Sequence, residues 1–152
     1  MGVRLIAVIQ RTKLGAVKVK DKIIGQIDKG FVIFLGVTDT DKETDADYLA
    51  DKIAHIRVFK DNNDKMNFSI QDVGGSALVI SQFTLCGDTR KGRRPSFIHA
   101  AHPDKGKVLY EYFMGQLKSK DITISSGEFG ATMEVSLVND GPATFVLDSN
   151  NR

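Results

Sequence analysis

The sequence predicts one mixed domain of β-strands and two helices over residues 1–152. Hydrophobic residues make up 41% of the 152 residues, which is enough to bury one core. Several short apolar runs bounded by turn residues predict strands, and two segments with apolar residues three and four apart predict helices. No linker, internal repeat or low-complexity tract separates these elements, so we expect a single domain.

Three or four strands are predicted at the start of the chain. Residues 3–11 are mostly apolar and indicate a buried strand. Residues 16–20 and 23–27 alternate between apolar and polar side chains around Asp21-Lys22, a pattern typical of a hairpin. Residues 30–37 are almost continuously apolar, which predicts a strand covered on both faces.

A first helix is predicted after Thr40 and Asp41, either of which can cap it. Its apolar residues recur three and four apart on one face, at Ala46, Leu49, Ile53 and Ile56. A second helix is predicted to begin at Pro103, because proline is tolerated in the first turn. Its apolar residues fall four apart and are expected in the core, at Val108, Leu109, Tyr112, Phe113 and Leu117.

Composition and motifs exclude several classes of function. The formal net charge is +2, so no strong overall field attracts nucleic acid. No apolar run approaches the ~20 residues of a membrane span, and the single cysteine, Cys86, suits a reducing cytosol; we expect a soluble, cytoplasmic protein. The sequence has no phosphate-binding glycine loop, no serine nucleophile elbow and no cysteine or histidine cluster with metal spacing.

Two stretches depart from the ordinary strand pattern. Ser81-Gln82-Phe83-Thr84-Leu85 places small polar groups directly after the apolar run at residues 77–80, where a buried strand is expected to end. Gly141-Pro142 separates residues 133–138 and 144–147, which both indicate strands. A hairpin turn is the simpler interpretation of Gly141-Pro142, and a functional turn is the alternative, since proline is excluded from central strands.

Cations are concentrated after the first of these stretches, at Arg90, Lys91, Arg93 and Arg94. Such a run is usually solvated surface, but its position next to a candidate site makes a phosphate-bearing partner a second interpretation. Thr84 is the one candidate nucleophile, and no His, Asp or Glu within the motif could serve as its base.

Taken together, these stretches resemble the D-aminoacyl-tRNA deacylase family. The resemblance covers almost the whole chain and rests on residues 81–85 and 139–144, with Val8-Ile9-Gln10-Arg11, residues 30–36, Lys65-Met66-Asn67, residues 92–97 and Phe129-Gly130. Two departures are Ala143, where the family usually has valine, and a few extra residues before the first strand.

The resemblance implies an α+β fold, with β-barrel-like mixed or antiparallel sheets and two main helices packed outside. It implies a homodimer with an active site at each subunit interface, and neither a metal nor an organic cofactor. Catalytic roles fall to Ser81, Gln82, Phe83 and Thr84, and contacts with tRNA to Arg90, Lys91, Arg93 and Arg94. A cis Gly141-Pro142 turn inserted from the other subunit, with Arg11 and Met133, would bind the substrate and reject L-aminoacyl groups.

The implied reaction is hydrolysis of the ester of D-aminoacyl-tRNA, and also of glycyl-tRNA, as translational proofreading. Water attack on an ester polarised by amides near Phe83 and Thr84 is favoured over attack by the Thr84 hydroxyl. Two alternatives remain: a relative with a trans Gly-Pro bond that acts on L-aminoacyl-tRNA, and a non-catalytic nucleic-acid-binding factor.

Overall fold

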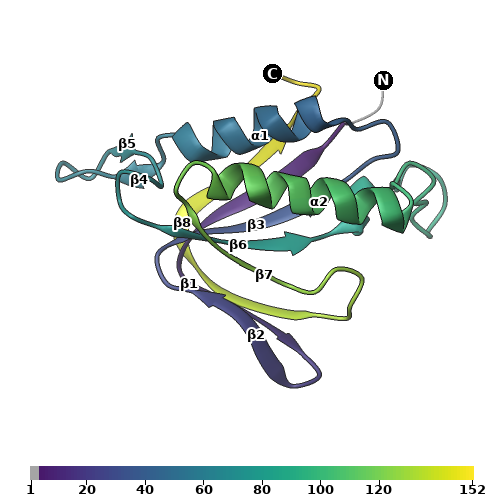
Figure 1. Cartoon of the computed structure of the whole chain (residues 1–152), viewed down its shortest axis with the longest axis horizontal. Helices are drawn as coiled ribbons and strands as arrows, with labels where there is room; N and C mark the ends of the chain where they lie inside the picture. The colour runs from purple at the N-terminus through teal and green to yellow at the C-terminus, as the bar shows by residue number, and fades with distance from the viewer. Residues whose placement is uncertain (1–3) are drawn as a thin grey trace.

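The structure is a computed structural model that describes residues 4–152. The expected start of the first strand at Val3, and the extra residues before it, lie outside the described residues. Figure 1 shows a curved sheet with two helices on one face. The elements are β1 (Ile6–Val19), β2 (Lys22–Ile27), β3 (Gly30–Gly36), α1 (Glu43–His55), β4 (Phe59–Lys60), β5 (Met66–Phe68), β6 (Ser76–Ser81), the 3-10 helix η1 (Phe83–Cys86), α2 (Pro103–Lys118), β7 (Thr123–Ser126) and β8 (Glu134–Asp148).

The main sheet is mixed and nearly closed on itself. Its strand order is β2-β1-β3-β6-β7, and β8 pairs with β1. β1 is antiparallel to β2, β3 and β8, whereas β3–β6 and β6–β7 are parallel pairs. The sheet curls until β7 approaches β2, where the Ser125 hydroxyl donates to the Gln26 carbonyl at 3.3 Å. The barrel-like mixed fold with two outer helices is therefore confirmed.

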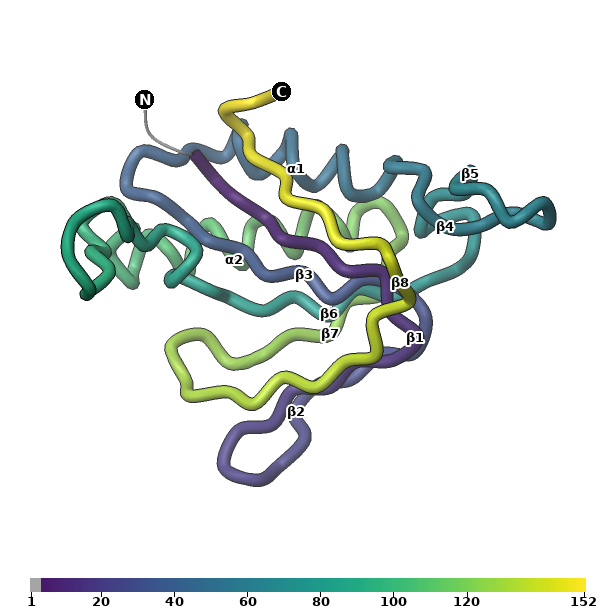
Figure 2. Tube along the Cα trace, turned by 180° about the vertical axis from the view of Figure 1, so that it is seen from behind, coloured from purple at the N-terminus to yellow at the C-terminus, as the bar shows by residue number. Residues whose placement is uncertain are grey.

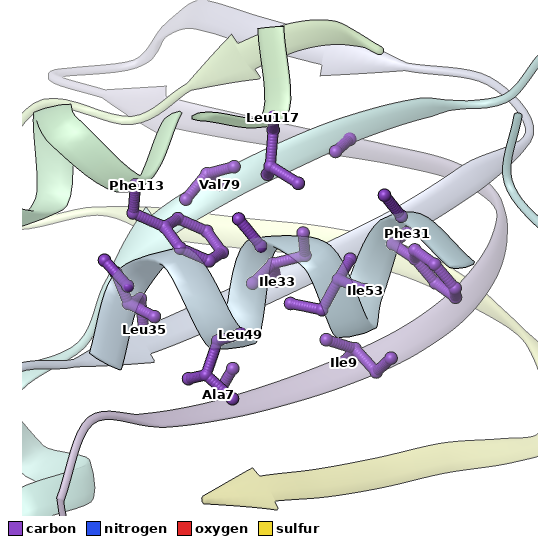
Figure 3. Packing of buried hydrophobic residues seen from close by; sticks show 14 of the residues in the cluster. Ala7, Ile9, Phe31, Ile33, Leu35, Leu49, Ile53, Val79, Phe113 and Leu117 are labelled. Atoms are coloured by element: carbon purple, nitrogen blue, oxygen red, sulfur yellow. The ribbon is translucent and has the colours of Figure 1, made fainter. Parts of the chain in front are cut away.

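Two hydrophobic clusters lie on opposite faces of this sheet. Side chains alternate between the faces of a strand, so Ala7, Ile9, Phe31, Ile33 and Leu35 point toward the helices. There they pack against buried residues of both helices, as Figure 3 shows, including Leu49, Ile53, Phe113 and Leu117. The second cluster fills the curled part of the sheet and contains Val17, Ile27, Val32, Leu78 and Ile80.

The local sequence patterns predicted the main helices and strands, but not all of the residues at which they begin and end. The hairpin is formed as predicted, but its turn is Lys20-Asp21, both with positive φ, because Val19 pairs with Lys22. The N-cap of α1 is Lys42 rather than Thr40 or Asp41. The Asp41 carboxylate instead accepts the Thr38 N–H at 2.7 Å, in the loop before the helix.

The buried stripe of α2 is narrower than the periodicity predicts. Leu109, Phe113 and Leu117 are buried, as predicted, but Val108 is 65% exposed. Leu109, Phe113 and Leu117 form the row of α2 side chains that faces the sheet, and Val108 lies on the helix surface beside this row. The expectation that Val108 belongs to the core was therefore wrong.

Candidate active site

The first candidate stretch forms the end of β6 and the turn after it. Strand β6 stops at Ser81, the first residue of this stretch, because the chain then turns into η1. The Gln82 N–H donates to the Leu35 carbonyl at 2.8 Å, and the Leu85 N–H donates to the Gln82 carbonyl at 3.1 Å. In a 3-10 helix the first N–H groups have no acceptor within the helix, which leaves those of Phe83 and Thr84 available for a ligand.

The side chains of this turn offer no base for Thr84. Thr84 is exposed, and the Gln82 Nε2 atom donates to its hydroxyl oxygen at 2.5 Å. An amide that donates to the hydroxyl cannot take its proton, so the contact orients Thr84 without activating it. The ring of Phe83 is 57% exposed and meets Phe97 edge to face, with centroids 5.1 Å apart.

Cys86 at the end of η1 is not an activated thiol. Its Sγ atom donates to the Val37 carbonyl at 3.5 Å. Burial, together with the nearby carboxylates of Asp41 and Asp39, raises the pKa of Cys86 to about 11. Cys86 is therefore a neutral, half-buried side chain with a structural role.

The second candidate stretch is a bulge within one strand. Gln10 of β1 pairs with Thr144 and Thr12 pairs with Asn139, so residues 140–143 lie opposite Arg11 alone. The hairpin interpretation of Gly141-Pro142 was therefore wrong, since β8 continues in the same direction on both sides. The Gly141-Pro142 peptide bond is cis, as the resemblance implies, and both residues are exposed.

Arg11 ties this bulge to the body of the protein. Its side chain is 1% exposed, and its Nε atom donates to the Asp140 carbonyl at 2.9 Å. Its Nη1 atom donates to the Val58 carbonyl at 2.6 Å, in the segment after α1. On the other side, Asn139 Nδ2 donates to the carbonyls of Arg11 at 3.1 Å and Ala143 at 3.4 Å. The bulge is thus held at both ends.

The two candidate stretches lie at opposite ends of the sheet. The bulge faces Arg11, whereas Ser81 is in register with Leu35, which pairs with Ala7. Residues 7 and 11 are separated by roughly 13 Å along the strand, and β8 and β6 by roughly 14 Å across the sheet. Figure 2 shows this arrangement, with the bend of β8 and the teal segment that follows β6 at opposite sides. One chain therefore does not bring Gly141-Pro142 to Thr84.

Met133 lies near the end of β6 and not with the bulge. A Cβ atom on Gly127 would lie 2.5 Å from Met133 Sδ and 3.4 Å from the Ile80 side chain, so Met133 is next to the end of β6. It packs, partly buried, against the second cluster. The four residues expected to bind substrate are thus divided between two ends of the molecule.

The basic residues form an exposed loop beside η1. The loop is closed by two backbone hydrogen bonds between Asp88 and Ser96, at 2.7 and 2.8 Å. Arg90 donates to both carboxylate oxygens of Asp88, at 2.9 and 2.7 Å, and these bonds hold the pKa of Asp88 well below its usual range. Among residues 4–152 the structure shows no ion pair for Lys91, Arg93 or Arg94, so these three present the free charges of the loop.

A family model for D-Tyr-tRNA(Tyr) deacylase matches residues 8–148, and the chain belongs to this family of hydrolases. A D-aminoacyl-tRNA deacylase of Thermus aquaticus is 54% identical over 146 residues, 96% of each chain. That of Clostridioides difficile (strain 630) is 53% identical, over 95% of this chain and 97% of the relative.

Two solved structures share the architecture. One, named c-Myc DNA Unwinding Element Binding Protein, is 34% identical, with a TM-score of 0.87 over 93% of this chain and 97% of that one. A probable eukaryotic D-amino acid tRNA deacylase has a TM-score of 0.81 over 95% and 98% of the two chains, and at 17% identity it supports the fold alone. Within residues 4–152, no helix is both long and apolar enough to cross a membrane.

We expect Arg11→Lys to lower the free energy of unfolding by about 1–3 kcal/mol. Lysine keeps the charge but cannot reach the carbonyls of Asp140 and Val58 together, which leaves a buried acceptor unpaired. Urea unfolding measures the difference. The matched control is Lys13→Ala, an exposed change two residues along β1, which should fall within about 0.5 kcal/mol of wild type. Equal stability of Arg11→Lys and wild type would contradict the bridging role.

Proposed function

We propose that this protein hydrolyses the ester bond of D-aminoacyl-tRNA in the cytoplasm, releasing the free D-amino acid and tRNA. Glycyl-tRNA is a second substrate, because it has no side chain to reject. The observation that carries this proposal is the exposed Gly141-Pro142 bulge held by buried Arg11, in a chain that belongs to the deacylase family.

The active form is a homodimer. An apolar row crosses the sheet face that points away from the helices, since Val8 is in register with Val146 on one side and with Phe34 on the other. Val146 is 66% exposed, and Val8 and Phe34 are half-buried. Isologous contact of this face with a second copy would remove the row from water.

Twofold symmetry explains why the two halves of the site lie apart in one chain. In the proposed dimer, two such sheets stack on this face, and the twofold axis runs between them, parallel to the sheets and perpendicular to the line from the bulge to η1. Rotation about this axis exchanges the two ends of the sheet. The bulge of one protomer is placed over η1 of its partner, and each of the two sites contains Gly141-Pro142 from one chain with residues 81–84 and Met133 from the other.

A main-chain filter suits the problem of chirality. D- and L-aminoacyl esters carry the same groups, and a fitted apolar pocket separates substrates that differ by a methylene by only about 1–3 kcal/mol. Rejecting the abundant L-substrate instead requires atoms that do not yield. The bulge offers such atoms, because proline restricts the backbone and Arg11 fixes its flank. Backbone groups of the bulge then hold the α-amino group and leave no room for an L side chain.

For ester cleavage, the N–H groups of Phe83 and Thr84 stabilise the oxyanion while water attacks the carbonyl carbon. The ester C–O bond breaks, and the 3′-terminal ribose oxygen of the tRNA leaves and takes up a proton. The neighbouring ribose hydroxyl assists the attacking water. Thr84 acts through its main chain and its contact with Gln82, since its hydroxyl has no base beside it.

The loop that holds Arg90, Lys91, Arg93 and Arg94 binds the acceptor stem. Lys91, Arg93 and Arg94 are the stronger candidates for phosphate contacts, because the guanidinium of Arg90 is already shared with Asp88. The packing of Phe83 on Phe97 joins this loop to η1, so a tRNA end that enters the site passes beside these charges.

A non-catalytic nucleic-acid-binding role is the second candidate. It is favoured by the 34% identical structure, whose name describes a protein that binds a DNA unwinding element, and by the exposed basic loop. The two candidates differ in one outcome. An enzyme releases the amino acid from the tRNA, whereas a binding factor retains the charged tRNA in a complex.

Incubation of the protein with D-tyrosyl-tRNA and, separately, with L-tyrosyl-tRNA tests the proposal. We expect rapid loss of the D-ester and loss of the L-ester only at the rate without protein, because the bulge excludes the L side chain. Equal loss of both esters would refute the chiral filter. Retention of both esters together with a gel shift would identify a binding factor.

Thr84→Ala separates the two mechanisms for cleavage. If water attacks, the variant keeps the main-chain N–H and its kcat should fall by less than about 100-fold. Removing a true nucleophile costs about 10⁴-fold or more. Single-turnover deacylation of D-tyrosyl-tRNA measures the rate, with tRNA binding as the control for folding. A fall of 10⁴-fold with intact binding would show that Thr84 is the nucleophile.

A further inference from the structure

The position of η1 depends on a glycine outside the motif that contains the turn. We propose that Gly36 is a positioning residue, whose bare Cα forms the surface on which η1 rests and so places the N–H groups of Phe83 and Thr84. This inference rests on the proposed role of those two amides. Gly36 contributes no group to the reaction and acts only through the turn.

Two hydrogen bonds hold η1 on either side of Gly36. The Gln82 N–H at the start of the turn donates to the Leu35 carbonyl at 2.8 Å. The Cys86 Sγ at its end donates to the Val37 carbonyl at 3.5 Å. The turn therefore spans the end of β3, and Gly36 lies directly beneath it.

The space between Gly36 and the turn is too small for a methyl group. A Cβ atom on Gly36 would lie 2.9 Å from Leu85 Cβ, 3.1 Å from Ile6 Cγ2 and 3.2 Å from Cys86 Sγ. The first contact cannot be relieved by rotating a side chain, because Leu85 Cβ is bonded to the main chain of the turn. β1 holds Gly36 in place through its pairing with Ile6, so the turn is the part that must move.

A displaced turn changes the rate of the reaction more than the affinity for substrate. Amides that stabilise an oxyanion act only when they are aimed at its position, and a misplacement of about 1 Å costs about 10²-fold. A shift of a few tenths of an ångström should therefore lower kcat by about 3- to 10-fold. The KM should change by less than about threefold, because the basic loop and the bulge are untouched.

The test compares Gly36→Ala with Gly15→Ala in deacylation of D-tyrosyl-tRNA and in amide NMR spectra. Gly15→Ala is the matched control, because its Cβ would lie 2.7 Å from Val32 Cγ2 and so crowds the sheet away from η1. We expect Gly36→Ala to lower kcat and to shift the amide signals of Phe83 and Thr84, and Gly15→Ala to do neither. The effect of Gly36→Ala should nearly vanish in a Leu85→Gly background, where the first contact is absent.

Wild-type kcat in a folded Gly36→Ala variant, or an equal loss of kcat in the Leu85→Gly background, would overturn the inference. Unshifted amide signals of Phe83 and Thr84 in Gly36→Ala would also overturn the inference, and this measurement does not require activity. An inactive wild-type protein would instead refute the proposed function. If Gly36→Ala does not fold, Leu85→Ile adds a branch to the same contact from the side of the turn. Unchanged kcat in that folded variant would also overturn the inference.

Discussion

The site depends on one buried guanidinium. A charged side chain that is 1% exposed needs hydrogen-bond or ion-pair partners, or its burial is strongly unfavourable. For Arg11, the bulge of β8 offers the Asp140 carbonyl to Nε, with the Asp140 carboxylate 3.4 Å away, and the segment after α1 offers the Val58 carbonyl to Nη1. The buried Nη2 atom has no hydrogen-bond partner among residues 4–152. The bulge and Arg11 therefore specify each other. Gly141-Pro142 is exposed by the same departure from regular pairing that gives the Arg11 guanidinium its acceptor on β8.

The proposed function assigns recognition and cleavage to main-chain groups at two ends of one sheet. A side chain can swing away from an unwanted substrate, whereas a strand held by its neighbours cannot. The proposed site is incomplete in one protomer. In the proposed dimer, the contact that removes the apolar row through Val8, Phe34 and Val146 from water is also the contact that brings the two ends together.

Features governed by neighbours in sequence could be predicted, and features governed by distant partners could not. The strand near residues 30–36 and the helix from Pro103 follow from local periodicity. Two strands were predicted in place of β8, because its continuous pairing with β1 cannot be recognised from the local sequence. The motif identified residues 81–84 as a group. The roles of Gly36 and Asp88 were missed, since the first matters only through contact with Leu85 and the second only through Arg90.

The central claim is that each site combines η1 of one chain with the bulge of the other, and mixed dimers test it directly. One chain carries Gly141→Ala and Pro142→Ala; the other carries Phe83→Pro, which removes a proposed oxyanion donor at a position that tolerates proline. Each homodimer should be inactive. A heterodimer isolated through two different tags contains one intact site and should recover about half of the wild-type rate. A heterodimer no more active than either parent would contradict the account.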